Sequence, residues 1–230
     1  MSRIENPDYY SKKLFAQKLK KAYEIASPRI NQYLEAEIQY VNDRIQSSDT
    51  VLELGCGYGR VLKRLADKVN KIIGIDIAEA SLKYAEEYLI GKSNVELHFM
   101  TARSIKFNDE TFDAVVGIQN AVSALKIEPK LLLQESMRVT KDGGKVFLSS
   151  YSEKIWEERL SWFIQQSDEG LLGEIDHNKT KNGTIVCNNG FKSTTYSESD
   201  FKKLVRELKL DATIEEVDES SIFCVITVSH

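Results

Sequence analysis

Three glycines at alternate positions, directly after a short apolar segment, constrain the fold more than any other feature of this chain. The segment is Val-Leu-Glu-Leu at residues 51–54, a pattern typical of a buried strand, and Gly55, Gly57 and Gly59 follow it. A helical pattern of apolar side chains begins at once, at Val61, Leu62, Leu65, Ala66 and Val69. Because glycine has no Cβ, a strand that bends through glycines into a helix lets a ligand approach bare backbone.

The spacing of these glycines separates the chain from dinucleotide-binding enzymes. The fingerprint G-x-G-x-x-G would need its third glycine at the position of Arg60, whereas here it falls one residue earlier, at Gly59. A nicotinamide-dependent oxidoreductase is therefore only a rival interpretation.

Between residues 50 and 151, apolar strands alternate with helical patterns. The predicted strands lie at 50–54, 71–75, 95–100, 113–118 and 145–151. The predicted helices lie at 58–68, 78–89 and 129–139. Strands that alternate with helices of this length are typical of βαβ units, so we expect an α/β fold with a parallel sheet.

The segments on either side have their own patterns. Residues 8–46 are predicted to form two amphipathic helices, with Ser27 as N-cap and Pro28 as first residue of the second. Beyond residue 151 we expect a helix, a hairpin, a helix and two strands, at 154–166, 172–196, 197–208, 212–217 and 222–228. The tight connection between the last two strands implies antiparallel pairing.

Composition excludes several classes of protein. The net charge of −4 over 230 residues argues against a generally basic surface for nucleic acid. Apolar runs stay well below the roughly 20 residues that span a bilayer, and we predict a cytoplasmic protein without a signal peptide or membrane segment. Cys56, Cys187 and Cys224 lie far apart, which predicts neither a disulfide framework nor a metal site.

An acidic residue closes the second predicted strand. Asp76 follows the apolar segment 72–75 and stands 21 residues after Gly55. An acid at this distance sits at the tip of the strand beside the glycine bend, where it can accept hydrogen bonds from both ribose hydroxyls of a nucleoside.

Glu53 completes the pattern E-x-G-x-G-x-G with the three glycines. This pattern resembles motif I of the class I S-adenosylmethionine-dependent methyltransferases, here of the small-molecule type. The resemblance implies a Rossmann-like, mostly parallel seven-stranded sheet with an antiparallel last strand and helices on both faces. It also implies S-adenosylmethionine as cofactor, with S-adenosylhomocysteine as product. The predicted C-terminal hairpin agrees with that sheet.

The resemblance assigns roles to individual residues. Glu53 is expected to contact the methionyl amine of the cofactor, and the backbone amides near Gly55 and Gly57 to meet its methionine part. Asp76 would bind the ribose. Thr101 stands where relatives usually carry the aspartate that holds the adenine amine, which is a departure from the family pattern. The remaining predicted cofactor contacts are Cys56, Tyr58, Ile77, Ala102, Ile118, Gln119 and Tyr10.

Catalysis of methyl transfer requires mainly in-line positioning, because the sulfonium is already a strong electrophile. The candidate catalytic residues are His177, as a general base on the hairpin, and Tyr151, as a pocket contact. The sequence N-P-P-Y, typical of enzymes that methylate amino groups of bases or glutamine, does not follow Gln119. Its absence argues against a nucleic-acid base as substrate.

These observations predict an enzyme that transfers a methyl group to N or O of a small molecule. The alternatives are a protein or RNA methyltransferase and a module that binds S-adenosylmethionine without turnover. We expect a monomer or homodimer built from a helical cap, a cofactor-binding core, an inserted helix-and-hairpin lid and a C-terminal part that completes the sheet, at 1–46, 47–151, 152–197 and 198–230.

Overall fold

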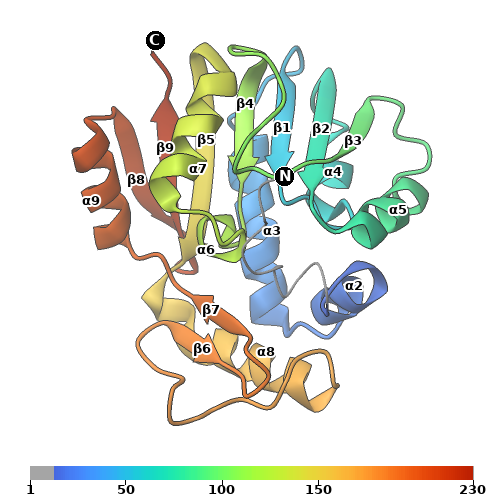
Figure 1. Ribbon diagram of the computed structural model, residues 1–230, viewed down its shortest axis with the longest axis vertical. Coiled ribbons are helices and arrows are strands. Elements are labelled where there is room, and N and C mark those ends of the chain that lie inside the picture. The colour runs from blue at the N-terminus through green and yellow to red at the C-terminus, as the bar shows by residue number, and fades with distance from the viewer. Residues whose placement is uncertain (1–12, 230) are drawn as a thin grey trace.

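Seven strands form one sheet at the centre of the molecule (Figure 1). The computed structural model describes residues 13–229. From edge to edge the strands are β3 (Val95–Phe99), β2 (Lys71–Asp76), β1 (Thr50–Leu54), β4 (Phe112–Gly117), β5 (Thr140–Tyr151), β9 (Ser221–Thr227) and β8 (Ala212–Val217). The first five run parallel, and β9 runs antiparallel to both of its neighbours. The structure therefore confirms the predicted sheet with its antiparallel last strand.

Helices cover both faces of this sheet because successive side chains of a strand point to opposite faces. From β1, Leu52 and Leu54 pack on one face and Val51 on the other. The first face is covered by α7 (Pro129–Val139) and α9 (Glu198–Leu208). The second is covered by α3 (Pro28–Asn42), α4 (Arg60–Leu65) and α5 (Glu79–Tyr88).

A third apolar cluster lies beyond the carboxyl ends of the parallel strands, in the lower part of Figure 1. It joins residues of the N-terminal helices to the segment inserted after β5. The contributing elements are α2 (Ala16–Glu24), the start of α3, η1 (Glu153–Ile155), α8 (Trp156–Asp168) and β6 (Thr184–Val186), with Phe191 just before β7 (Lys192–Thr194). The N-terminal helices and the insertion thus form one layer over the strand ends, where α/β sheets bind their ligands.

Arg159 of α8 fastens the hairpin β6–β7 to this layer. Its guanidinium donates to the carbonyl oxygens of Gly183 and Ser193 and to the hydroxyls of Ser193 and Thr195. The side chain is only 1% exposed. A buried cation needs such partners, since an unpaired buried charge is strongly destabilising.

Most predicted elements are found within a few residues of their expected bounds. Ser27 caps α3, accepting from the amide of Ile30 at 3.2 Å. The helix after the glycines is shorter than the predicted 58–68, because Gly59 at φ +89° precedes its first turn. A short helix that the sequence did not predict, α6 (Ala121–Ala124), follows β4. None of the helices in the described part of the chain is long and apolar enough to cross a membrane.

Candidate functional site

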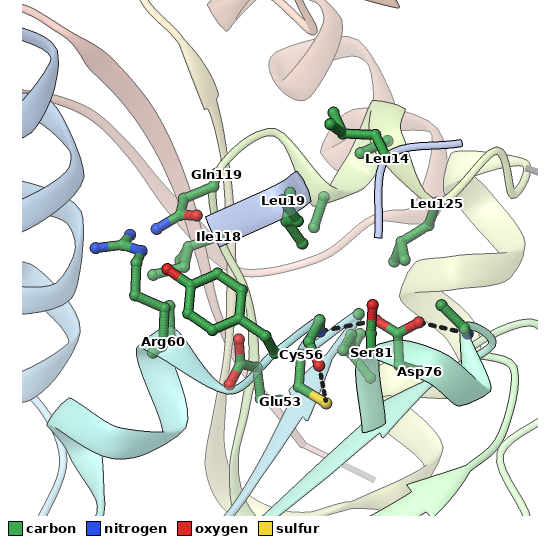
Figure 2. A pocket seen from close by; sticks show the side chains of 18 of the residues that line it. Leu14, Leu19, Glu53, Cys56, Arg60, Asp76, Ser81, Ile118, Gln119 and Leu125 are labelled. Carbon is green, nitrogen blue, oxygen red and sulfur yellow. Dashed lines mark hydrogen bonds between the residues drawn. The ribbon is translucent and has the colours of Figure 1, made fainter. Parts of the chain in front are cut away.

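A pocket opens at the carboxyl ends of β1, β2 and β4, and residues of α2 and α8 also line it; Figure 2 shows part of its lining. It encloses about 1340 Å³ of space outside atoms, part of it open to solvent. The position agrees with the general rule that α/β sheets bind ligands beyond their strand ends.

The glycine bend forms the floor of this pocket. Gly55 and Gly57 have φ of +71° and +54°, a left-handed conformation that glycine adopts without a steric penalty. The amides of Gly55 and Cys56 both donate to the carbonyl oxygen of Ile75, at 2.8 and 3.0 Å. The amide of Gly57 donates to Asp76 Oδ2. The backbone donors predicted to meet the cofactor's methionine part are therefore already engaged within the protein.

Asp76 stands at the tip of β2 and holds the bend in place. Its Oδ2 accepts from the amide of Gly57 at 2.8 Å and its Oδ1 from the amide of Ala78 at 2.7 Å (Figure 2). Burial raises the pKa of this carboxyl, and the two amides oppose that shift. Each carboxylate oxygen can accept a further hydrogen bond. Asp76 is therefore able to receive two hydroxyl donors from the pocket while still bracing the loop.

Glu53 and Arg60 are two complementary charges at the opposite side of the pocket. Glu53 is 5% exposed, and its Oε2 has no hydrogen-bond partner among residues 13–229. Burial raises the pKa of Glu53 to about 8, with Arg60 opposing and Asp76 reinforcing the shift. Within the same described range, Arg60 Nε and Nη2 are also buried without a partner. One open acceptor and two open donors match the ammonium and carboxylate of an amino acid.

These groups fit S-adenosylmethionine, whose ends are an amino acid and a nucleoside. Glu53 and Arg60 would hold the amino-acid end, and Asp76 would hold the ribose. The two sites lie on β1, α4 and β2, on either side of the glycine bend. The fit rests on the orphaned atoms of Glu53 and Arg60, which need a polar partner because an unpaired buried group costs free energy.

Apolar side chains lie directly over the bend. A Cβ at Gly57 would stand 2.9 Å from Leu19 Cδ2, and one at Gly55 would stand 2.8 Å from Leu125 Cδ2. The helix α2, which carries Leu19, is tied to α5 by the amide of Ala16, which donates to Ser81 Oγ at 3.0 Å. A ligand on the bend therefore requires these leucines to shift.

The pocket gathers nearly all of the predicted site residues within the described range. Those that line it are Glu53, Gly55, Cys56, Gly57, Tyr58, Asp76, Ile77, Thr101, Ala102, Ile118, Gln119 and Tyr151. Thr101 Oγ1 accepts from the amide of Arg103 at 3.2 Å. Tyr10 lies outside the described residues.

His177, the candidate general base, lies away from the other predicted site residues. It lies exposed on a turn before β6 and is not among the residues that line the pocket. The adjacent Asp176 pairs with Lys179 at 2.8 Å, facing solvent on the same turn. The hairpin packs on Arg159 and Phe163 through its inner face, which leaves this turn on the outside.

Several lining residues were missed by sequence reasoning. They include Arg60, Ser81 and Gln166, which lie on α4, α5 and α8. Arg60 had a usable signal, because it directly follows the third glycine. The others look like ordinary members of amphipathic helices.

Comparison with known proteins agrees with this geometry. A family model described as a methyltransferase domain matches residues 51–144. An uncharacterized protein of Methanocaldococcus jannaschii is 32% identical over 165 residues, which cover 70% of this chain and 73% of that protein. A ubiquinone/menaquinone biosynthesis C-methyltransferase of Escherichia fergusonii is 27% identical over 199 residues, covering 81% of this chain and 74% of the enzyme. In three other relatives the match spans only 42%, 57% and 43% of their length.

The fold also recurs among solved structures. The crystal structure of a protein from Pyrococcus horikoshii matches with a TM-score of 0.64 and 24% identity, over 88% of this chain and 92% of that one. At this level of identity the likeness establishes the arrangement of strands and helices, and chemistry has to be argued from the site.

Proposed function

The chain belongs to the class I S-adenosylmethionine-dependent methyltransferases, and from this premise we propose that it transfers a methyl group to a small organic molecule. The observation that carries the proposal is the pairing of two half-sites across one glycine bend. Glu53 and Arg60 offer unpaired buried atoms on one side, and Asp76 offers a carboxylate on the other. This is the complement of an amino acid joined to a ribose.

A small-molecule acceptor is supported by the cap over the pocket. Residues of α2 and α8 line the cavity together with the strand ends, so the acceptor has to fit beneath them. The Escherichia relative is named as a C-methyltransferase of quinone biosynthesis, which adds carbon to the N and O acceptors expected from the sequence. We propose that residues 1–46 and 152–197 form this cap, while 47–151 and 198–230 form the cofactor-binding core.

The chain's own part in the reaction is to bind, orient and exclude water. S-adenosylmethionine supplies an activated methyl group when it is bound. Glu53, Arg60 and Asp76 would fix its two ends, so that its position along the bend is set. Apolar and aromatic side chains such as Leu19, Leu125 and Tyr23 would keep water from the space between cofactor and acceptor.

Methyl transfer is tested with S-adenosylmethionine labelled in the methyl group and a panel of phenols, amines and carboxylates. The proposal expects label in one class of acceptor and formation of S-adenosylhomocysteine in equal amount. Binding of the cofactor without turnover on any small acceptor, but with turnover on RNA or protein, would contradict the small-molecule assignment. Binding without any turnover would instead favour a non-catalytic module.

Arg60 gives a prediction with a matched control. We expect Arg60→Met to weaken S-adenosylmethionine binding by roughly tenfold to a hundredfold, because a charge-assisted hydrogen bond to a carboxylate is worth about 1.5–3 kcal/mol. Arg64→Met is the control, since Arg64 lies on the same helix and also pairs with Glu35 but does not line the pocket. Isothermal titration calorimetry of both variants measures the difference. Equal affinities in the two variants would remove Arg60 from the cofactor site.

A further inference from the structure

The part of the pocket that faces α2, α3 and α8 is walled by aromatic rings. Tyr23 and Trp162 have ring centroids 6.0 Å apart, and Tyr33 and Tyr151 have centroids 5.3 Å apart. All four line the cavity, and Trp162 is fixed by a hydrogen bond from Nε1 to the carbonyl oxygen of Ala22. Rings held in this way favour a flat apolar ligand that can stack or pack edge-on against them.

Two side-chain amides also line this pocket. Gln166 of α8 is 2% exposed, and Gln119 lies two residues past the end of β4. Both residues line the pocket, and the Nε2 atom of each is buried with no partner in the described part of the chain. Leaving such a group unpaired costs about 1–3 kcal/mol, which a ligand that hydrogen-bonds to both amides would recover.

Gln119 is held firmly in its position. Its φ of +59° lies in the left-handed region, which is uncommon for residues other than glycine and is often found at functional sites. Its backbone N–H donates to Glu37 Oε2 at 2.9 Å and to Ser149 Oγ at 3.0 Å. The hydroxyl of Tyr23 donates to Gln119 Oε1 at 3.0 Å. Tyr23 thus takes Oε1, and the Nε2 donor remains for a ligand.

The charges around this region favour an anion over a cation. Arg159 lies 4.0 Å from the centre of the Tyr151 ring, directly behind the pocket wall. Burial raises the pKa of Glu37 to about 7 and that of Glu53 to about 8, so both carboxyl groups are partly protonated near neutral pH and oppose an anion less than fully ionised carboxylates would. If Glu53 and Arg60 hold the amino-acid end of the cofactor, those two charges are also matched to each other. The positive charges left are Arg159 and the sulfonium, and they disfavour an ammonium substrate.

A carboxylate substrate fits less well than a phenol. Carboxylates are best held by the two-pronged donor set of a free guanidinium. The donors of Arg159 are directed to Gly183, Ser193 and Thr195 of the hairpin, so its charge acts on the pocket through the Tyr151 ring without offering that fork. A single oxygen on an aromatic ring needs only one or two neutral donors, which the glutamine amides provide.

We propose, building on the function proposed above, that the methyl acceptor is a phenol, bound as its phenolate with the ring against the aromatic walls and the oxygen at the amides of Gln119 and Gln166. The phenol O–H bond breaks with its electron pair left on oxygen, and the proton passes to bulk water. The positive surroundings stabilise the resulting anion. Its oxygen would bond to the methyl carbon as the methyl–sulfur bond breaks with its electron pair left on sulfur, so that S-adenosylhomocysteine leaves. Attack by an ortho ring carbon would in addition release the hydrogen of that carbon to water as a proton.

The test is a binding measurement with 4-nitrophenol, whose ionised form absorbs visible light. With S-adenosylhomocysteine present, the protein should shift the titration of 4-nitrophenol to lower pH and bind it more tightly than 4-nitrobenzoate or benzylamine. Gln166→Leu should weaken binding of 4-nitrophenol roughly tenfold, as expected for one lost buried hydrogen bond. The matched control is Gln165→Leu, at an exposed position on the same helix, which should leave binding unchanged.

Thermal unfolding separates ligand binding from a structural role for Gln166. Removing an unpaired buried amide should leave the Tm equal or higher, whereas a structural role predicts a lower Tm. Tighter binding of benzoate or amine, or unchanged 4-nitrophenol binding in Gln166→Leu, would overturn the phenol assignment. Affinity for S-adenosylhomocysteine is measured separately with wild-type protein, so failure of the proposed function is recognised independently.

Discussion

Asp76→Asn is expected to weaken S-adenosylmethionine binding by roughly tenfold to a hundredfold. The carboxylate at the tip of β2 is the only group we assign to the ribose, and a charge-assisted hydrogen bond is worth about 1.5–3 kcal/mol. Asparagine keeps the size and one acceptor oxygen, which can still receive the amide of Ala78. If that oxygen keeps the Ala78 amide, the NH₂ group stands where Oδ2 now accepts from the amide of Gly57. An NH₂ group cannot accept there, so that contact is lost. Calorimetry of the folded variant measures the effect.

The control for this substitution is Asp67→Asn. Asp67 is an exposed acid that pairs with Lys92 on the surface and does not line the pocket. A surface ion pair contributes little, so affinity and Tm should both stay near the wild-type values. If Asp76→Asn also binds S-adenosylmethionine like the wild type while remaining folded, the ribose has to be held elsewhere. A large loss of Tm in Asp76→Asn alone would instead trace its effect to the bracing of the glycine bend.

The proposed cofactor half of the site could be predicted from the sequence because its signals are local. The glycines and Asp76 lie at the ends of adjacent parallel strands, and the register of β1 with β2 brings those ends together. The apolar runs also predicted β1 and β8 with the bounds that the structure shows. For the glycine bend and for these strands, the pattern within a few residues determines the local conformation. They can therefore be predicted without knowledge of long-range contacts.

The acceptor half could not be read in the same way. Gln166 and Trp162 lie on a helix whose pocket-facing side is decided by packing against α3 and the N-terminal helix. His177 was chosen for its chemistry, yet hairpin packing turned it to the outside. Glu37 did have a signal: it lies four residues after Tyr33 and four before Val41, on the apolar face of its helix. An acid in such a stripe is costly to bury, and here it supports the backbone of Gln119.

Glu37 should make the protein less stable as pH rises from about 5 to about 8. Burial is the main cause that raises the pKa of Glu37 to about 7, against an ordinary value of 4.5. A group whose pKa is higher in the folded state binds its proton more tightly there. Its contribution to stability is therefore complete at low pH and is lost as pH rises through the folded pKa.

Glu37→Gln measures this contribution, because glutamine stays neutral throughout and can still accept from Ser149 at the position where Oε1 now accepts. Relative to wild type, we expect the free energy of unfolding of the variant to gain roughly 2–3 kcal/mol between about pH 5 and about pH 8. Urea denaturation across that range gives the difference, in which the groups that both proteins share cancel. Glu157→Gln, at an exposed position on α8, is the control and should give a profile parallel to wild type. Parallel profiles for Glu37→Gln as well would mean that Glu37 is as readily ionised in the folded chain as in the unfolded one, and that the hydrogen bonds from Ser149 and Gln119 offset its burial in full.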